Sequence, residues 1–165
     1  MYSRDESLLV KRKSKVAPTP EPEPVLDARA CAFKLRVGPS RIHRWGVFAE
    51  ELIPARRKIM EYTGEKISRR ETKRRADGPL NYLFTLNSYW CIDGNVGGSG
   101  AQYVNHCCNP NVYAWIVKEH ILYMSVRDIH PGEELTLDYH FDKDVERVPC
   151  YCGAANCRGR INLSK

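Results

Sequence analysis

Seven cysteines are the residues in this sequence whose types and spacing most clearly suit chemistry. Cys150, Cys152 and Cys157 follow a C-x-C-x4-C pattern beside charged residues, a setting that does not suit a buried apolar core. Structural zinc takes four ligands, and cysteine thiolates are among the commonest. The pattern therefore predicts three ligands of a zinc site, rather than three unrelated buried thiols. A fourth ligand must come from elsewhere.

The segment "VNHCCNPN" at residues 104–111 is one source of that ligand, through His106, Cys107 or Cys108. Cys31 and Cys91 are the other candidates, and spacing alone leaves the choice open. The same segment carries three asparagines, whose amides suit hydrogen bonding to a polar ligand. A thiolate from this loop would tie the C-terminal segment to it. The metal would then fold a segment that has little core of its own.

The length and composition limit what kind of protein carries these groups. The 165 residues suit one domain, and 42% hydrophobic residues suit a folded core. The net charge of +6 favours acidic partners but is too small to indicate nucleic acid by itself. No apolar run is long enough to cross a membrane, and the polar N-terminus lacks the apolar stretch of a secretory signal. We therefore expect an intracellular, non-secreted protein with reduced thiols, no membrane partner and no specific nucleic-acid partner.

Short strands must position most of these groups. Residues 1–30, with prolines at alternate positions from Pro18 to Pro24, predict a disordered tail. A helix is expected at residues 68–76, where Ser68 and Glu71 have capping-box spacing. Short aromatic or β-branched runs separated by turn residues predict strands at residues 33–37, 45–53, 81–86, 90–93, 112–117, 121–126 and 134–139. The sequence therefore predicts a mainly β protein.

Five segments, in the same order and with matching gaps, resemble motifs of the SET-domain protein lysine methyltransferases. They are "IHRWGVF" at 42–48, "YTG" at 62–64, "NHCCNPN" at 105–111, "ELTLDY" at 134–139 and "CYCGAANCRG" at 150–159. Each is weak alone, and together they are highly specific. The resemblance implies a mainly β fold of several small sheets with a knot-like threaded crossing and few short helices. It also implies a SET domain at residues 31–142 and a post-SET zinc-binding segment at residues 143–165.

The resemblance implies a ligand set and a cofactor as well. The cysteine of the family's NH motif falls on Cys108, so the implied Zn²⁺ ligands are Cys108, Cys150, Cys152 and Cys157. Cys107 stands where the family usually has serine. The implied cofactor is S-adenosylmethionine (SAM). Asn105 and His106 resemble the pair that holds SAM, by side-chain amide and by backbone, although the histidine could instead be a zinc ligand.

Other positions follow or depart from the family pattern. His43 and Trp45 fall at backbone-contact positions for SAM, and Tyr82 resembles a tyrosine that meets the cofactor's amino-acid end. Trp45 could equally be a packing residue. Arg44 replaces the first glycine of the family's GxG strand. Leu137 occupies the position that limits the number of methyl groups in the family, and a side chain without a hydroxyl there predicts di- or trimethylation.

Two tyrosines are the implied catalytic residues. Tyr139 in "ELTLDY" shares one strand face with Leu135 and Leu137 by the period-two rule, and the resemblance places that face where cofactor and lysine channel meet. Tyr62 resembles the tyrosine that lines the channel and hydrogen-bonds the amine. Without the motifs, a core tyrosine with a satisfied hydroxyl would be the simpler interpretation of either residue, because the chain has nine tyrosines.

Together these features imply a protein-lysine N-methyltransferase that transfers methyl groups from SAM to a protein or peptide lysine. Histone tails are the commonest targets in the family. The alternative is a catalytically weak SET-like module that binds basic protein tails, and the presence of Tyr62, Asn105, His106 and Tyr139 argues against it. A zinc-ribbon nucleic-acid binder would need a second C-x2-C knuckle, which the sequence lacks. We expect the protein in the nucleus if it is eukaryotic and in the cytoplasm otherwise.

Overall fold

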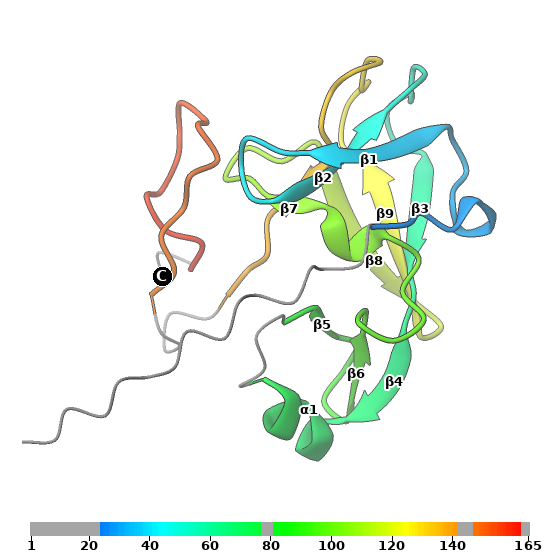
Figure 1. Cartoon of the computed structure of the whole chain (residues 1–165), viewed down its shortest axis with the longest axis vertical. Helices are drawn as coiled ribbons and strands as arrows, with labels where there is room; N and C mark the ends of the chain where they lie inside the picture. Colours follow the sequence, from blue (N-terminus) through cyan, green and yellow to red (C-terminus); the bar gives the residue numbers. More distant parts are fainter. Residues whose placement is uncertain (1–23, 77–80, 142–146, 163–165) are drawn as a thin grey trace, which may run out of the picture.

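Three small β-sheets make up the described part of the chain, which comprises residues 24–76, 81–141 and 147–162 of a computed structural model. A two-stranded sheet pairs β1 (Leu35–Pro39) with β2 (Trp45–Ala49). A three-stranded sheet has the order β4 (Glu65–Ser68), β6 (Trp90–Asp93), β5 (Leu83–Thr85). A five-stranded sheet lies between these two along the long axis (Figure 1).

The five-stranded sheet has the order β3 (Lys58–Tyr62), β9 (His120–Ser125), β8 (Val112–Val117), β10 (Thr136–Leu137), β7 (Asn105–His106). Strands β8 and β9 form a hairpin whose two turn residues, Lys118 and Glu119, both have positive φ. That backbone matches the right-handed twist of the paired strands. The inward side chains of Val112, Ile121 and Tyr123 are buried in the main core, so one face of the sheet carries most of the apolar packing.

Strand β10 brings two distant segments to one place. It pairs in parallel with both β7 and β8, so that Thr136 lies opposite Asn105 and Leu137 opposite His106. The buried Asn111 amide secures this insertion, because its Nδ2 donates to the Glu134 carbonyl and its Oδ1 accepts from the Thr136 N–H. One asparagine of "VNHCCNPN" is therefore structural. The threaded crossing implied by the resemblance stays a prediction.

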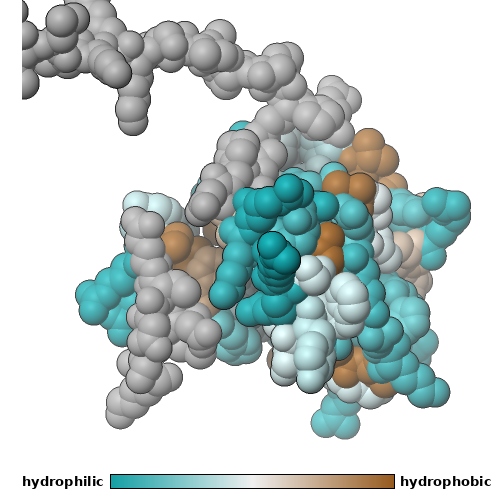
Figure 2. Space-filling model, turned by 90° about the horizontal axis from the view of Figure 1, so that it is seen from below, coloured by the Kyte–Doolittle hydropathy of each residue, from teal (hydrophilic) through white to brown (hydrophobic). Residues whose placement is uncertain are grey.

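The helix α1 (Arg69–Arg75) lies at the end of the molecule with the three-stranded sheet. Its N-cap is Ser68, whose side chain accepts from the Glu71 N–H, as capping-box spacing predicted. Arg75 pairs with Glu71, Glu65 and Asp93, so much of the local positive charge is balanced. Figure 2 shows this end face as mostly hydrophilic. No helix among the described residues is long and apolar enough to cross a membrane.

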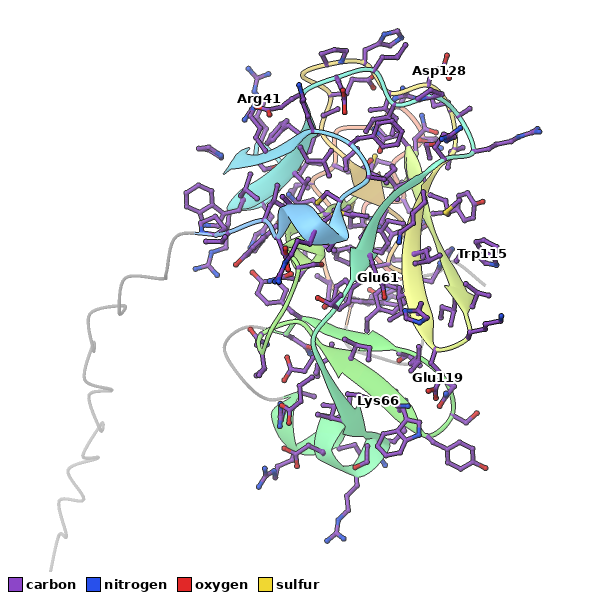
Figure 3. The ribbon with its side chains drawn as sticks, turned by 90° about the vertical axis from the view of Figure 1, so that its right-hand side faces the viewer. Arg41, Glu61, Lys66, Trp115, Glu119 and Asp128 are labelled. Atoms are coloured by element: carbon purple, nitrogen blue, oxygen red, sulfur yellow. The ribbon has the colours of Figure 1, made fainter. Side chains whose placement is uncertain are left out.

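A surface ion pair joins the three-stranded and five-stranded sheets. Lys66 in β4 donates to Glu119 in the β8–β9 turn at 2.8 Å, and both side chains point into the junction between the sheets (Figure 3). Both are largely exposed, so the pair contributes little stability on its own. It marks where the two sheets meet.

The predicted strands and helix are confirmed in type, with shifted ends, whereas β3, β4 and β7 were not predicted. The expected tail ends earlier than residue 30. Leu26 packs against the core beside Gly100, Asp27 donates its N–H to the Ser99 carbonyl, and a 3-10 turn, η1, spans Ala28–Ala30. One leucine in a proline-rich stretch gave no periodic signal for this packing. Residues 1–23 lie outside the described residues.

Candidate active site and metal centre

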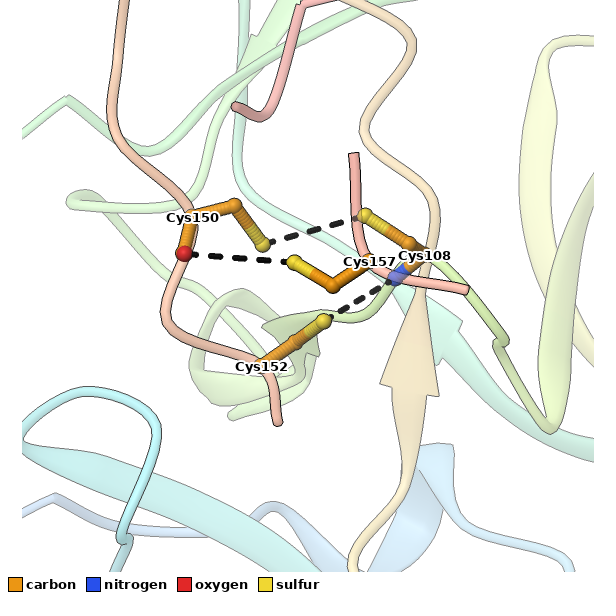
Figure 4. Close-up of side chains that lie close together, drawn as sticks. All are labelled: Cys108, Cys150, Cys152 and Cys157. Atoms are coloured by element: carbon orange, nitrogen blue, oxygen red, sulfur yellow. Dashed lines mark hydrogen bonds between the residues drawn. The ribbon is translucent and has the colours of Figure 1, made fainter. Parts of the chain in front are cut away.

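Four cysteine sulfurs converge beside the edge of the five-stranded sheet. The Sγ atoms of Cys108, Cys150, Cys152 and Cys157 all lie within 4.8 Å of one another (Figure 4). No other group of three or more potential His, Cys, Asp or Glu ligands comes together in the described ranges. Four sulfur ligands at this spacing suit a tetrahedral metal such as Zn²⁺.

The C-terminal segment, residues 147–162, folds back on itself to present three of these sulfurs. Pro149 and Arg160 form an antiparallel bridge, and the Ile161 N–H donates to the Val148 carbonyl at 2.9 Å. Gly153 and Gly159 have positive φ, a conformation that glycine adopts without steric cost. The two turns made by these glycines bring the cysteines of the C-x-C-x4-C pattern together.

Backbone N–H groups support negative charge on the sulfurs. The Arg158 N–H donates to Cys108 Sγ at 3.4 Å, the Gly159 N–H to Cys157 Sγ at 3.4 Å, and the Cys108 N–H to Cys152 Sγ at 3.5 Å. Burial raises the pKa of the Cys152 thiol, but the N–H groups of Cys108 and Ala154 and the neighbouring thiols outweigh it and lower the pKa to about 6. A thiolate stabilised by N–H donors is the form of cysteine that binds zinc, so these residues fit Zn²⁺.

Cys31 and Cys91 lie apart from this group, whereas Cys107 lies beside it without being one of the four. Cys91 Sγ accepts from Arg69 in the three-stranded sheet, and Cys31 Sγ donates to the Asp27 carbonyl near the N-terminus. Cys107 directly precedes Cys108, yet its Sγ accepts from the Asn109 N–H, and it is not among the four converging sulfurs.

Tyr139 lies where β10 ends beside β7. Its hydroxyl donates to the Val104 carbonyl at 2.8 Å, and its ring packs edge-on against the His106 ring. Burial raises the pKa of Tyr139 well above its usual value, with the Tyr82 hydroxyl and the Glu134 carboxylate adding to the shift. The hydroxyl therefore stays protonated across any ordinary pH range.

Tyr62 approaches the same region from β3. Its hydroxyl donates to the Tyr82 carbonyl, and its ring contacts Phe84 and Tyr123 with centroids 5.2 Å and 6.1 Å away. Burial raises its pKa, followed by the effect of the nearby Tyr139 hydroxyl. Two tyrosine hydroxyls and two carbonyls thus form a cluster of uncharged oxygen atoms beside an apolar aromatic wall. Together with the field of Glu134, this environment suits a positively charged sulfonium methyl group.

Asn105 holds the segment that contains His43 and Trp45. Its Nδ2 donates to the Trp45 carbonyl and to Glu134 Oε1 at 2.8 Å each, and to the His43 carbonyl at 3.3 Å. Glu134, which the sequence reasoning did not single out, also accepts from the Ser40 hydroxyl. A Cβ at position 46 would collide with this carboxylate, so the second glycine of the GxG strand is required there.

Arg44, at the position of the first glycine, has a φ of 46°. This left-handed conformation is unfavourable for a residue with a side chain and is one that glycine adopts freely. The family's glycine is thus explained by the backbone at this point. The substitution to arginine keeps the loop geometry at a cost in conformational strain.

The His106 imidazole is engaged within the protein on both nitrogens. Nδ1 accepts from the Tyr139 N–H at 3.2 Å, which leaves Nε2 protonated and 3.4 Å from Cys108 Sγ. Burial lowers the pKa of His106, so the ring is neutral near pH 7. The ring is not one of the four converging ligands, and it lies between the four-cysteine group and Tyr139. Any contact of His106 with a cofactor would therefore be through its backbone.

Comparisons with known proteins agree with this arrangement. The family model for the SET domain matches residues 44–140. The chain is 40% identical over 136 residues to an H3 lysine-4 specific histone-lysine N-methyltransferase of Saccharomyces cerevisiae, covering 74% of this chain and 13% of the relative. It is 39% identical over 139 residues to the histone-lysine N-methyltransferase SETD1A of Homo sapiens, covering 78% of this chain and 8% of the relative. This chain thus spans only a small part of these relatives' length.

A solved structure shares the fold. The crystal structure of KRYPTONITE in complex with mCHG DNA and SAH matches with a TM-score of 0.69 and 30% sequence identity. The match covers 79% of this chain and 29% of that chain. Several small sheets with few short helices, as the resemblance implied, are therefore the fold of this protein.

Proposed function

The chain belongs to the SET-domain family, and from this we infer that it is a SAM-dependent protein-lysine N-methyltransferase. The cluster of uncharged oxygen atoms around Tyr62 and Tyr139 carries the proposal, because it offers polar partners to an amine and a polarised methyl beside apolar rings. Similarity to proteins named as histone-lysine N-methyltransferases supports the reaction. The SAH in the KRYPTONITE structure, which is demethylated SAM, supports the cofactor.

The chain's own residues would align and desolvate the reacting amine. SAM supplies a methyl group on a positively charged sulfonium. A lysine amine has a pKa near roughly 10.4 in water, so most of it is protonated near neutrality and must lose a proton before it can attack. The rings of Tyr62, Phe84 and Tyr123 exclude water and so favour the neutral amine. The hydroxyls of Tyr62 and Tyr139 stay protonated and orient the amine toward the methyl group.

The cofactor would lie along the segments that Asn105 joins. We assign to it the backbone of His43 and Trp45, the amide of Asn105, the backbone of His106, and Tyr82, which contributes to the raised pKa of Tyr139. Cys108, Cys150, Cys152 and Cys157 would hold one Zn²⁺ with a structural role. Four protein ligands leave the metal no open position for substrate.

The substrate class we propose is the histone H3 tail. The Saccharomyces cerevisiae relative is named as specific for H3 lysine 4, and its similarity covers 74% of this chain, whose residues 44–140 match the SET-domain model. A histone substrate would place the protein in the nucleus. Because the chain covers between 8% and 13% of these relatives, the choice of lysine and the need for other domains are properties that only a direct assay can assign.

Leu137 favours the addition of more than one methyl group. It is 5% exposed and lies opposite His106 and Val112, so an aliphatic side chain fills this position. Tyr113 follows Val112 on the other face of β8 and is 44% exposed, so its hydroxyl does not replace the missing one. We expect di- or trimethylated product at long incubation. Leu137→Tyr should shift product toward monomethyl, and Leu137→Phe is the matched control that adds the ring without the hydroxyl.

The test is a methylation assay with isotope-labelled SAM and each core histone, followed by mapping of the modified site. The proposal predicts label on a lysine of the H3 tail. Label on another protein lysine would keep the activity and overturn the substrate. Calorimetric binding of SAM without any transfer to histones or to lysate proteins would favour the non-catalytic module that binds basic tails.

A further inference from the structure

We propose that Arg158 is a positioning residue that connects the four-cysteine group to the strand end carrying Tyr139. The proposal rests on the proposed function, because positioning of Tyr139 has consequences for rate only if this tyrosine acts in methyl transfer. Arg158 directly follows the last cysteine, and Asp138 directly precedes Tyr139. The contacts between Arg158 and Asp138 therefore join the C-terminal segment to the candidate active site.

The guanidinium of Arg158 binds Asp138 through both of its terminal nitrogens. Nη1 donates to Oδ2 at 2.7 Å and Nη2 donates to Oδ1 at 2.8 Å, which is a bidentate pair. Nη2 also donates to the Ile161 carbonyl at 3.1 Å. The two side chains are only 21% and 15% exposed, so water competes weakly for these bonds. A two-point contact fixes orientation as well as distance.

The backbone of Arg158 is anchored at the same time to the sulfur group. Its N–H donates to Cys108 Sγ, so the residue that contacts Asp138 is also bonded to a proposed zinc ligand. A second route runs from Cys108 Sγ to His106 Nε2 and from His106 Nδ1 to the Tyr139 N–H. Two separate connections thus run from Cys108 to the chain around Tyr139. One ends on the Asp138 carboxylate and the other on the Tyr139 N–H.

The planar two-point contact explains why arginine stands at this position. A lysine cannot make that contact with a carboxylate. Nε of Arg158 is buried without a hydrogen-bond partner, but so is Nε of Arg160, so this feature does not distinguish the two residues. The bidentate bond to Asp138 does distinguish them.

A cavity of about 230 Å³ beside Arg158 makes the idea directly testable. It is lined by Arg147, Val148, Pro149, Arg158, Gly159 and Arg160. Removal of the Arg158 side chain would enlarge it toward Asp138, so that a free guanidinium ion could enter. Arg160 lines the same cavity and has no hydrogen bond to Asp138, which makes Arg160→Ala the matched control.

The experiment compares the intact chain with Arg158→Ala, Arg158→Lys, Asp138→Asn and Arg160→Ala. We expect Arg158→Ala and Arg158→Lys to keep one zinc per chain and their affinity for SAM, and to lose about tenfold or more in kcat through misalignment. Millimolar methylguanidinium should restore part of kcat in Arg158→Ala only. The double variant Arg158→Ala/Asp138→Asn should be no worse than the poorer single variant, because both remove the same contact.

A readout without catalysis separates this idea from the proposed function. Hydrogen exchange of residues 136–141 should be faster in Arg158→Ala than in Arg160→Ala, even if no substrate is known. An unchanged exchange rate and kcat in Arg158→Ala would overturn the positioning role. So would loss of zinc in that variant without rescue by methylguanidinium, since this would show a purely structural role. Absence of methyl transfer in the unmodified chain would overturn the proposed function alone.

Discussion

The five-stranded sheet and the C-terminal segment contribute to the same candidate site, but different forces hold them. Val112, Ile121 and Leu135 of the sheet region are at most 1% exposed and belong to the main core. In the C-terminal segment, Val148 is 36% and Tyr151 is 76% exposed. The segment depends instead on four cysteines and on the Arg158–Asp138 pair. Burial of apolar surface stabilises the first region, and we propose that bound Zn²⁺ supplies most of the stability of the second.

This difference predicts that one region can unfold while the other keeps most of its structure. Tyr62, Tyr139 and Asn105 are placed by the sheet, so their geometry should survive damage to the C-terminal segment better than the segment itself does. The hydrogen bonds of Arg158 and His106 determine how far a structural change in the C-terminal segment extends toward Tyr139. The predictions below address the strongest dependence first.

The largest effect should come from the adjacent pair Cys107 and Cys108. Cys108→Ser should abolish stoichiometric zinc and unfold the C-terminal segment, since metal binding in small sites of this kind contributes on the order of 10 kcal/mol to folding. Cys107→Ser should retain about one zinc per chain by elemental analysis. Loss of zinc from the Cys107 variant, or its retention in the Cys108 variant, would contradict the assignment of ligands.

Tyr139→Phe should lower the rate with only a modest loss of stability, about 1–3 kcal/mol, from the lost hydrogen bond to the Val104 carbonyl. We expect kcat to fall by about 10²-fold, the usual effect of removing one oriented hydroxyl, with SAM affinity nearly unchanged. Tyr151→Phe, in the exposed part of the C-terminal segment, is the control and should change nothing. Equal loss of SAM binding and kcat in the Tyr139 variant would indicate a packing role.

Both regions should gain from a rise in pH, but through different titrating groups. The rate should rise by up to about tenfold per pH unit from pH 7 to 9, because the fraction of neutral lysine rises below its pKa of roughly 10.4. Burial raises the pKa values of Tyr62 and Tyr139, so neither hydroxyl loses its proton in this range and neither explains the rise. In the C-terminal segment, zinc should dissociate as pH falls, since protons compete for the thiolates. A flat rate profile would mean that a step other than chemistry limits turnover.

The smallest effect should appear at Arg44. Arg44→Gly should be more stable than Arg44→Ala by about 1 kcal/mol in urea unfolding, because glycine adopts the positive φ without steric cost. Both variants remove the side chain, so their difference isolates the backbone. If Ala and Gly are equally stable, the loop relaxes and the inferred strain is absent.

The sequence predicted the parts of the fold that have local signals. The hairpin β8–β9 and strand β6 are rich in aromatic or β-branched residues. The capping-box spacing that begins at Ser68 predicted the start of the helix. Strand β7 has two residues and exists because it pairs with β10, which no local pattern reveals, whereas β10 lies inside the predicted strand at residues 134–139. In β3, the charged residues Lys58 and Glu61 interrupt the apolar pattern.

The candidate site was likewise predicted where local spacing gives a signal and missed where it does not. Spacing predicted three thiol ligands, and only the family resemblance selected Cys108 over its neighbours. Asp138, Arg158 and Glu134 were missed although they lie inside the quoted motifs, because their roles depend on partners distant in sequence. A charged residue beside a motif tyrosine or cysteine was the available signal. The orientation of the His106 ring toward Cys108 depends on tertiary packing alone.

The central claim is that one active site is assembled from a region held by its apolar core and a region held by metal. Hydrogen exchange measured by mass spectrometry, before and after zinc removal with a chelator, tests it directly. We predict that protection is lost throughout residues 147–162, is reduced near Tyr139, and is retained in β8 and β9. Equal loss of protection in both regions, or no change in residues 147–162, would contradict the account.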